Sequence, residues 1–549
     1  MAAMELNRRE VLASLLGASF VSSAACKRVS SRVPVEGTLI DRIITTGHHL
    51  RDAPPVYASS VTRTLDAIIV GGGAAGLSAA WRLHSGGLDN FLVCELDDTL
   101  GGTAKSGQNA VTAYPWGAHY LPAPLTARGP VPRLLKEMGV LTGVDERGSP
   151  QYAEEALVNE PEERLFHKGH WYEGLYLHAG ASADDLAQWQ RFEAQLSAFA
   201  DARDAKDRKA FDIPVALSSD DAEWTQLDKI SAAQWLDAQG YTSPRLRWNV
   251  EYACRDDFGG DLSNISAWAA VWYFTARRSK DARSEGYLTW PDGNGHLIQH
   301  LAKGLGAQRI EKGFTLHTVR REGTLWRLDG FDSTTRAPKA YFARQVVLAV
   351  PRFIAARLVD AWRKTPPDFV KAFQYSPWVV ANLTLSATPR SRGFTTAWDN
   401  VLYESKSLGY VVATHQRARA NALGPSVWTW YYPLTGDDVR QERTRLLATN
   451  YGDWEAAVMS DLSPAHIDLA DYAQRLEVMR WGHAMVRPYP GFVWGGARQQ
   501  AQTSLENSLH FAHADLGGLA VFEEANHFGV LAAERVLASL EKKTDSWLA

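Results

Sequence analysis

Cysteine is scarce in this chain, and its acidic and basic residues nearly balance. The 549 residues contain only three cysteines, Cys26, Cys94 and Cys254. Three cysteines are too few for a disulfide framework or a cysteine-rich zinc cluster. The 58 basic residues stand against 62 acidic ones, so a formal charge of −4 gives no global attraction to nucleic acid. We therefore expect neither a metal site nor a nucleic-acid partner.

The first 26 residues resemble an export signal. Arg8 and Arg9 precede an apolar stretch that is shorter than the roughly 20 residues of a membrane span and that ends in small residues. The arginine pair is typical of twin-arginine signals, so we expect the twin-arginine export machinery as a partner and a periplasmic or cell-envelope location. Lipid attachment at Cys26 is an alternative, although Ser23 stands where a bacterial lipobox usually has Leu. Residues 27–63 are polar and proline-containing, which predicts an extended linker.

A strand, a glycine turn and a helix follow one another after residue 64. Residues 65–70, Leu-Asp-Ala-Ile-Ile-Val, predict a strand, and residues 77–83 predict a helix. Between them Gly71, Gly73 and Gly76 form the pattern G-x-G-x-x-G. The first glycine permits a tight turn, the second lets backbone N–H groups approach a diphosphate, and the third lets the helix pack on the strand.

An acidic residue at the end of the next strand completes a dinucleotide site. Ala74 and Ala75 lie in the predicted phosphate-binding turn, at a helix N-terminus that carries partial positive charge. Residues 91–94 predict a second strand, and Glu95 follows it about 20 residues after the glycines. Its carboxylate can accept both ribose hydroxyls of a dinucleotide and would repel a 2′-phosphate.

Further segments, which follow one another in a fixed order along the chain, indicate which dinucleotide is bound. They read L-G-G-T at 100–103, G-A-H-Y at 117–120, W-P-D-G-N-G-H-L at 290–297, V-V-L-A-V-P at 346–351, W-G-H-A through P-Y at 481–489, F-A-H-A-D at 511–515, and F-E-E-A through G-V-L-A-A at 522–533. Together they resemble the flavin-containing amine oxidase superfamily, which includes amine oxidases, protoporphyrinogen oxidases and phytoene desaturases. The resemblance spans roughly residues 64–541 and implies FAD as the cofactor.

The resemblance also implies which residues hold FAD and how the chain folds. Gly101, Gly102 and Thr103 would line the cofactor, Asp515 would approach its ribityl-phosphate portion, and the last helix, with Glu523 at its start, would point its N-terminus at it. The fold implied is α/β, a Rossmann-type FAD-binding domain with an inserted α+β substrate domain that is discontinuous in sequence. The expected FAD-binding parts are 64–129, 286–357 and 481–549, and the expected substrate parts are 130–285 and 358–480.

Several residues depart from the family pattern. Thr103 replaces a common Arg, while His513 and Glu524 replace Gly and Phe528 replaces Ser. Arg357 stands where amine-oxidising members place a Lys that holds a water near the flavin. An Arg stays charged near neutral pH and cannot shuttle protons, so amine oxidation is not inherited from the resemblance.

Three residues are candidates for catalysis by their motif positions. His119 and His483 are candidate acid–base groups because the pKa of histidine lies near neutral pH, although a structural histidine is an alternative interpretation for each. Arg357 is a candidate for binding an anionic group.

We expect an exported FAD-dependent oxidoreductase that oxidises a small apolar or amine-bearing substrate by hydride transfer, with oxygen or another electron acceptor. One alternative is desaturation or isomerisation of a polyene or terpenoid; another is a flavin-binding partner protein or electron carrier without its own substrate. Trp268 and Trp272 have helical spacing that favours core packing. The aromatic side chains of residues 428–432 alternate as those of a strand do. They could pack within a sheet or line a cage around an apolar or cationic substrate, and the sequence leaves both interpretations open.

Overall fold

A computed structural model describes residues 34–52, 57–278, 286–416 and 423–548. The expected export signal, with Arg8, Arg9 and Cys26, lies outside the described residues. The chain divides into two units, Met1–Val35 and Glu36–Ala549. The fold presented below is that of the second unit.

A seven-stranded sheet forms where the sequence predicts the dinucleotide domain. Five strands run parallel in the order β12, β3, β2, β15 and β21, and β15 continues into an antiparallel meander with β14 and β13. The bounds are β2 Arg63–Val70, β3 Phe91–Glu95, β12 Ile310–Lys312, β13 Phe314–Glu322, β14 Leu325–Asp332, β15 Pro338–Leu348 and β21 Leu509–Phe511. The two strands predicted at 65–70 and 91–94 are confirmed, each longer by one or two residues.

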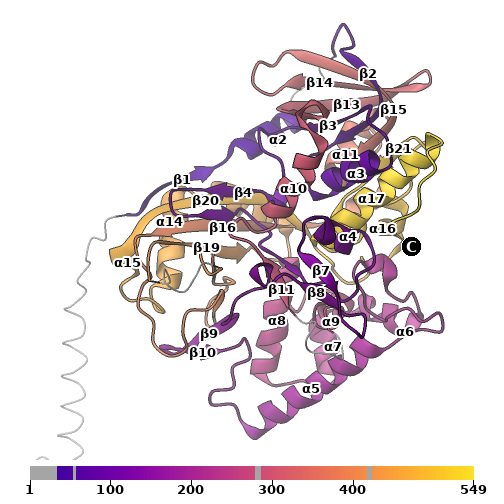
Figure 1. Ribbon diagram of the computed structural model, residues 1–549. Helices are drawn as coiled ribbons and strands as arrows, with labels where there is room; N and C mark the ends of the chain where they lie inside the picture. The colour runs from indigo at the N-terminus through magenta and orange to yellow at the C-terminus, as the bar shows by residue number, and fades with distance from the viewer. Residues whose placement is uncertain (1–33, 53–56, 279–285, 417–422, 549) are drawn as a thin grey trace, which may run out of the picture. The chain divides into compact units, whose positions relative to one another are not determined.

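Both faces of this sheet are buried, because successive side chains of each strand point to opposite faces. Ile69 and Val93 pack into a core on one face, while Ile68 and Leu92 pack into a second core on the other. Four helices contribute to the first core: α3 Ala74–Ser85, α4 Pro130–Glu137, α10 Gly295–Leu305 and α17 Phe522–Ser539. Figure 1 shows α3 and α17 side by side.

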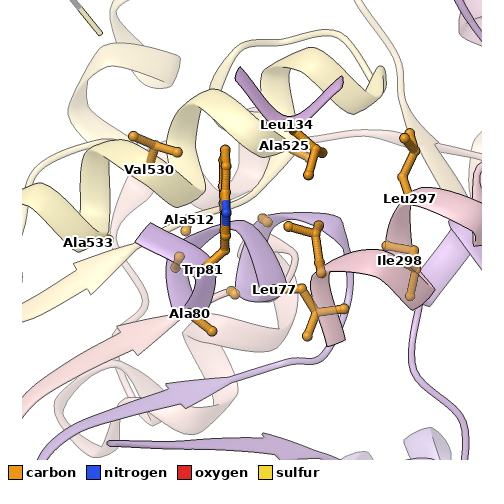
Figure 2. Packing of buried hydrophobic residues seen from close by; sticks show 14 of the residues in the cluster. Leu77, Ala80, Trp81, Leu134, Leu297, Ile298, Ala512, Ala525, Val530 and Ala533 are labelled. Carbon is orange, nitrogen blue, oxygen red and sulfur yellow. The ribbon is translucent and has the colours of Figure 1, made fainter. Parts of the chain in front are cut away.

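The packing of α3 against α17 relies on small residues and one large ring. Figure 2 shows Trp81 of α3 surrounded by Ala80 of its own helix and by Val530 and Ala533 of α17. Leu297 and Ile298 of α10 close the same core near Leu77. The alanine-rich sequence of α3 favours a helix, and its small side chains let α17 pack closely against it.

An eight-stranded sheet carries the second part of the fold. Its order is β1, β20, β16, β19, β18, β17, β9 and β10. The bounds are β1 Glu36–Ile40, β9 Glu163–His167, β10 His170–Glu173, β16 Tyr375–Leu385, β17 Asp399–Leu402, β18 Tyr410–Val412, β19 Ser426–Pro433 and β20 Ala473–Val486. Every residue of β16 is buried, as expected for a strand covered on both faces.

A helical group packs beside this sheet. Its members are α5 Ala183–Asp201, α6 Ala222–Thr225, α7 Ala232–Ala238, α8 Pro244–Phe258 and α9 Ala267–Thr275. Trp268 and Trp272 of α9 are fully buried in its core, which confirms their interpretation as packing residues. None of the helices in the described ranges is long and apolar enough to cross a membrane.

The remaining elements are short or peripheral. They are the helices α2 Arg42–Asp52, α11 Arg352–Leu358, α12 Asp360–Arg363, α13 Val439–Ala448, α14 Tyr451–Leu462, α15 Leu469–Tyr472 and α16 Gly496–Ala501, and the strands β4 Ser106–Gln108, β5 Ala113–Pro115, β6 Tyr120–Pro122, β7 Leu141–Val144, β8 Pro150–Tyr152 and β11 Tyr287–Thr289.

The structure corrects the expected extended linker at residues 27–63. Within it β1 pairs in parallel with β20, and α2 follows directly. The strand forms because the edge of β20 offers unpaired backbone groups, a partner that the local sequence does not reveal. The expected boundary between residues 480 and 481 falls inside β20, and α4, expected in the substrate part, packs into the core of the dinucleotide part.

Candidate functional site

The glycine turn after β2 has the backbone that its sequence predicts. Gly71 has a φ of +107°, and a Cβ there would lie 2.4 Å from the carbonyl oxygen of Ala349. A Cβ on Gly76 would lie 1.8 Å from the carbonyl oxygen of Gly71. Gly73, in contrast, has no atom within 3.8 Å of such a Cβ, so the chain is open there to an approaching ligand. The turn is thus closed on the protein side and open at its middle glycine.

The N-terminus of α3 has no side-chain cap. Gly73 is the residue before the first helical position and offers no side chain to the first-turn N–H groups, and that turn contains no acidic residue. Free N–H groups at a helix start, together with the helix dipole, form an anion site. Ala74, Ala75 and Gly76 present these N–H groups, so the residues fit a diphosphate.

Glu95 lies at the end of β3 beside this turn. Its Oε2 accepts a hydrogen bond from Gly72 N–H at 2.7 Å, and its Oε1 accepts one from Asp97 N–H at 2.9 Å. Burial raises the pKa of the Glu95 carboxyl above its ordinary value, while these two backbone donors oppose the rise. Each carboxylate oxygen can still accept another hydrogen bond, so the two oxygens together suit two ribose hydroxyls.

The predicted L-G-G-T segment lies directly against the glycine turn. Gly101 N–H donates to the carbonyl of Gly72 at 2.9 Å, and Gly101 and Gly102 both have positive φ angles, +121° and +57°. Thr103, which follows them, is exposed. The backbone of this segment, not a family-type Arg, therefore borders the dinucleotide crevice.

A cavity of about 130 Å³ opens next to Thr103. Its lining residues in the described part of the chain are Thr103, Gly117, Ala118, His119, Tyr120, Pro122, Asp256, Asp257, Arg277, Asn294, Trp378, Val380, Leu408, Tyr431, Trp481, Ala484, Met485, Ala520, Val521, Phe522 and Glu523. They come from β16, β19 and β20 of the eight-stranded sheet, from β6, from α8, from the start of α17 and from the loops between them.

Acidic groups outnumber basic ones among these lining residues. Asp256, Asp257 and Glu523 face a single guanidinium, that of Arg277. Arg277 Nη2 forms an ion pair with Asp257 Oδ2 at 2.6 Å, and Tyr120 donates to Asp257 Oδ1 at 3.4 Å. Asp257 is thereby neutralised, and Asp256 and Glu523 remain as surplus carboxylates. Burial raises the pKa of Glu523 to about 7.

Aromatic rings form one wall of the cavity around His119. Its ring centroid lies 4.9 Å from that of Tyr431, 5.0 Å from Tyr120 and 5.3 Å from Trp398. Desolvation by burial lowers the pKa of His119 to about 3, so the imidazole is neutral near neutral pH. A neutral imidazole donates from one nitrogen and accepts at the other.

Residues 74–537 match the model of a family described as flavin containing amine oxidoreductase. The chain belongs to the flavin-containing amine oxidoreductase family. FAD is accordingly its cofactor, and the protein is an FAD-dependent oxidoreductase. The uncapped α3, the open Gly73 and Glu95 are the residues of this chain that fit the adenosine diphosphate part of FAD.

Solved structures with the same fold include members with different substrates. Putrescine oxidase bound to putrescine is 16% identical, with a TM-score of 0.63 over 87% of this chain and 100% of that one. Cyclohexylamine oxidase from Brevibacterium oxydans IH-35A is 16% identical, with a TM-score of 0.60 over 87% and 100%. The CLA-producing fatty acid isomerase from P. acnes is 15% identical, with a TM-score of 0.57 over 86% of this chain and 98% of that one. No curated protein matches the chain.

Two of the three candidate catalytic residues of this family member lie away from the cavity. Arg357 is solvent-exposed on α11, and His483 on β20 stacks on Phe353 with ring centroids 4.2 Å apart. Neither lines the cavity, whereas His119 does. On a regular strand Trp481 and His483, two residues apart, would lie on the same face. The pairing of β16 with β20 shifts register between Met485 and Trp481, the stretch that contains His483.

Asp515 holds backbone in place through its carboxylate. Asp515 Oδ2 accepts hydrogen bonds from Arg352 N–H at 2.9 Å and from the Tyr375 hydroxyl at 2.6 Å. The side chain is fully buried among these partners. Asp515 thus fixes the chain beyond the C-terminal ends of β15 and β21, where open α/β sheets bind their ligands.

The sequence interpretation missed the acidic part of the cavity. Asp256 and Asp257 occur near the end of α8, and Arg277 follows α9. No motif marks them, and a charged helix end is usually solvated. Only the tertiary packing of α8 against the sheet brings them to His119 and Glu523.

Proposed function

We propose that this family member oxidises a small amine-bearing substrate by hydride transfer to FAD. The observation that carries the proposal is the surplus of carboxylates in an aromatic-walled cavity bordered by Thr103 and the start of α17. Such a cavity favours a cationic ligand, because its ring faces attract positive charge and because a cation would stabilise the ionised form of carboxyl groups whose pKa burial raises.

FAD, held by the glycine turn and Glu95, would supply the oxidising power by accepting one hydride, which carries two electrons, from the carbon next to nitrogen. The C=N product would be hydrolysed by water, and oxygen or another acceptor would return the cofactor to its oxidised state. The protein's own residues bind and orient. The neutral His119 accepts a hydrogen bond from the substrate nitrogen. Glu523, with a pKa of about 7, is poised to take the proton that an ammonium must lose before oxidation.

The carboxylates count against the alternative of a long apolar substrate. A polyene or fatty-acid chain in this cavity would desolvate Asp256 and Glu523 without offering them a partner, at a cost of several kcal/mol. The isomerase of the same fold shows that this architecture accommodates such chemistry, so the test includes an unsaturated fatty acid.

The test is anaerobic mixing of the FAD-loaded protein with amines, amino acids and an unsaturated fatty acid. We expect amines to bleach the visible flavin absorbance, with a rate that rises with pH through about 7 in wild type. Glu523→Gln should bleach more slowly and lose that pH dependence. Bleaching or isomerisation by the fatty acid alone would overturn the proposal. Reoxidation in air and with an artificial dye then identifies the acceptor class.

We also propose export through the twin-arginine pathway, supported by Arg8 and Arg9 before the short apolar stretch. This pathway suits a protein that must fold around its cofactor before transport. Replacing Arg8 and Arg9 together with Lys should retain the protein in the cytoplasm, whereas Arg28→Lys should not. Equal periplasmic amounts of all three forms would refute export by this route.

A further inference from the structure

Asn294 lies where the loop before α10 contacts the segment that carries His119. Its backbone N–H donates to the carbonyl of Ala118 at 3.1 Å, and its side-chain Nδ2 donates to the carbonyl of Tyr120 at 2.9 Å. Between these two contacts, the hydroxyl of Thr289 donates to the carbonyl of His119 at 2.8 Å. Asn294 therefore holds the backbone on both sides of His119.

The contact with Tyr120 decides which way the side-chain amide of Asn294 points. A backbone carbonyl accepts hydrogen bonds and donates none, so the NH₂ group faces Tyr120 and the oxygen faces away from it. Asn294 is 2% exposed and lines the cavity. Its Oδ1 is buried and accepts no hydrogen bond from the described residues. Such an oxygen costs free energy until a ligand or an ordered water donates to it.

The cavity wall at Asn294 is continuous with the segment that borders the dinucleotide crevice. Ala118 N–H donates to the carbonyl of Thr103 at 3.1 Å, so the backbone that Asn294 holds also contacts Thr103. Gly295, the next residue, packs just beyond Thr103, because a Cβ there would lie 2.6 Å from Ser106 Oγ. Asn294 thus contributes its free acceptor to the part of the cavity that adjoins the FAD site.

The chemistry of the isoalloxazine ring selects one atom as the partner of this acceptor. In the oxidised ring N1, N5, O2 and O4 accept hydrogen bonds, and N3–H is the only donor. We propose that Asn294 is a cofactor-binding residue whose Oδ1 accepts a hydrogen bond from flavin N3–H. Because Nδ2 of the same amide holds Tyr120, this one side chain connects the flavin ring to the backbone that carries His119. The assignment concerns cofactor binding and is independent of the substrate.

The test compares FAD with 3-methyl-FAD, in which a methyl group replaces the N3 hydrogen and the ribityl hydroxyls are unchanged. Quenching of flavin fluorescence during titration of the apoprotein gives the Kd of each compound for wild type and Asn294→Ala. In wild type we expect 3-methyl-FAD to bind about tenfold more weakly or worse, because the analogue leaves a buried acceptor unpaired. In Asn294→Ala the two Kd values should become nearly equal.

Thr289→Val is the matched control. It removes the other side-chain hydrogen bond to the same backbone segment, and Thr289 is not among the described residues that line the cavity. Both compounds should bind this variant more weakly by a similar factor, so the preference for FAD should persist. If the control lost the preference as well, Asn294 would act on the backbone alone, and the contact with N3–H would be refuted.

Two other results overturn the proposal. Equal Kd values for both compounds in wild type would mean that water or a ribityl hydroxyl donates to Oδ1 of Asn294. A preference for FAD that survives in Asn294→Ala would mean that other atoms exclude the methyl group. If Asn294→Ala binds neither compound, NMR of wild type with ¹⁵N-labelled FAD decides: we expect an N3 proton that exchanges slowly with water, and exchange as fast as in free FAD refutes the contact.

Discussion

At the scale of single residues, Glu95 connects the cofactor to the fold. Its two oxygens already bind the N–H groups of Gly72 and Asp97, so the carboxylate orients the glycine turn before any ligand arrives. The same oxygens can then accept the ribose hydroxyls. One side chain therefore contributes to both the shape and the affinity of the FAD site.

Glu95→Gln should weaken FAD binding. The amide keeps one acceptor oxygen but places an NH₂ group against a backbone N–H, which costs about 1–3 kcal/mol and hence roughly five- to 150-fold in Kd. Quenching of flavin fluorescence during titration of the apoprotein measures this Kd. The exposed Glu146→Gln serves as control, and equal Kd values for both variants would show that Glu95 does not contact the ribose.

Glu524 gives the protein a pH-dependent stability. Its carboxyl is fully buried and accepts a hydrogen bond from Val215 N–H. Burial raises its pKa from 4.5 to about 7. The folded state therefore binds this proton more tightly than the unfolded state does. The resulting stability is fully present below pH 4.5 and is lost as the pH rises through about 7.

Glu524→Gln should remove that loss. Compared with wild type, the variant should gain about 3 kcal/mol of unfolding free energy between roughly pH 5 and pH 8, because the amide never ionises. Urea unfolding at several pH values measures the difference, with Glu146→Gln as the control. A constant difference between wild type and Glu524→Gln across the pH range would contradict the assigned pKa.

At the scale of elements, the contact between α3 and α17 depends on Gly529. A Cβ at this position would lie 2.3 Å from the carbonyl oxygen of Ala75, an atom of the helix turn that presents N–H groups to the diphosphate. Backbone atoms cannot rotate away, so a side chain here must push the helices apart. The packing of the two helices is thus coupled to the phosphate site.

Gly529→Ala should destabilise the protein by about 1–3 kcal/mol and reduce its FAD content, since overpacking shifts α3. Gly304→Ala is the matched control, because Gly304 lies in α10 with no atom within 4 Å of an added Cβ. That control should be neutral or slightly stabilised by the better helix propensity of Ala. Thermal unfolding and the flavin-to-protein absorbance ratio test both, and equal behaviour of the two variants would disprove the close contact.

The local sequence predicted those helices, strands and turns whose residue pattern is visible within the segment itself. The strand ending at Val70, the glycine turn and the helix beginning at Ala74 have periodicity and special backbone needs that the chain itself displays. β1 was missed because its residues form a strand only beside the edge of β20. Asp256 and Asp257 were missed for a similar reason: nothing in α8 reveals which helix face meets the cavity.

At the scale of the second unit, the cavity exists because the eight-stranded sheet, the segment at Thr103 and the start of α17 converge. Trp378 and Trp481 come from the eight-stranded sheet, Thr103 from the dinucleotide part, and Glu523 from α17. The eight-stranded sheet ends in β1, which Asp41 anchors through a two-contact ion pair with Arg480, at 2.6 and 3.0 Å. The segment before the dinucleotide fold is thereby part of the eight-stranded sheet.

Asp41→Asn should lower the unfolding free energy by about 1 kcal/mol, because it leaves the largely buried Arg480 without its carboxylate partner. The exposed Asp52→Asn, which breaks an ion pair with Arg51, should leave the unfolding free energy nearly unchanged, because solvent screens this pair. Urea unfolding compares the two. If Asp52→Asn lowered the unfolding free energy more than Asp41→Asn does, the ion pair between Asp41 and Arg480 would contribute nothing measurable to stability.

The central claim is that FAD lies between the uncapped α3 and the acid-lined cavity. A crystal structure of the FAD complex tests it most directly. The account predicts the diphosphate at the N–H groups of Ala74, Ala75 and Gly76, a ribose on Glu95, and the flavin ring beside Thr103 with the carboxylates facing its open side. A diphosphate bound elsewhere, or a flavin ring separated by protein from Asp256 and Glu523, would contradict it.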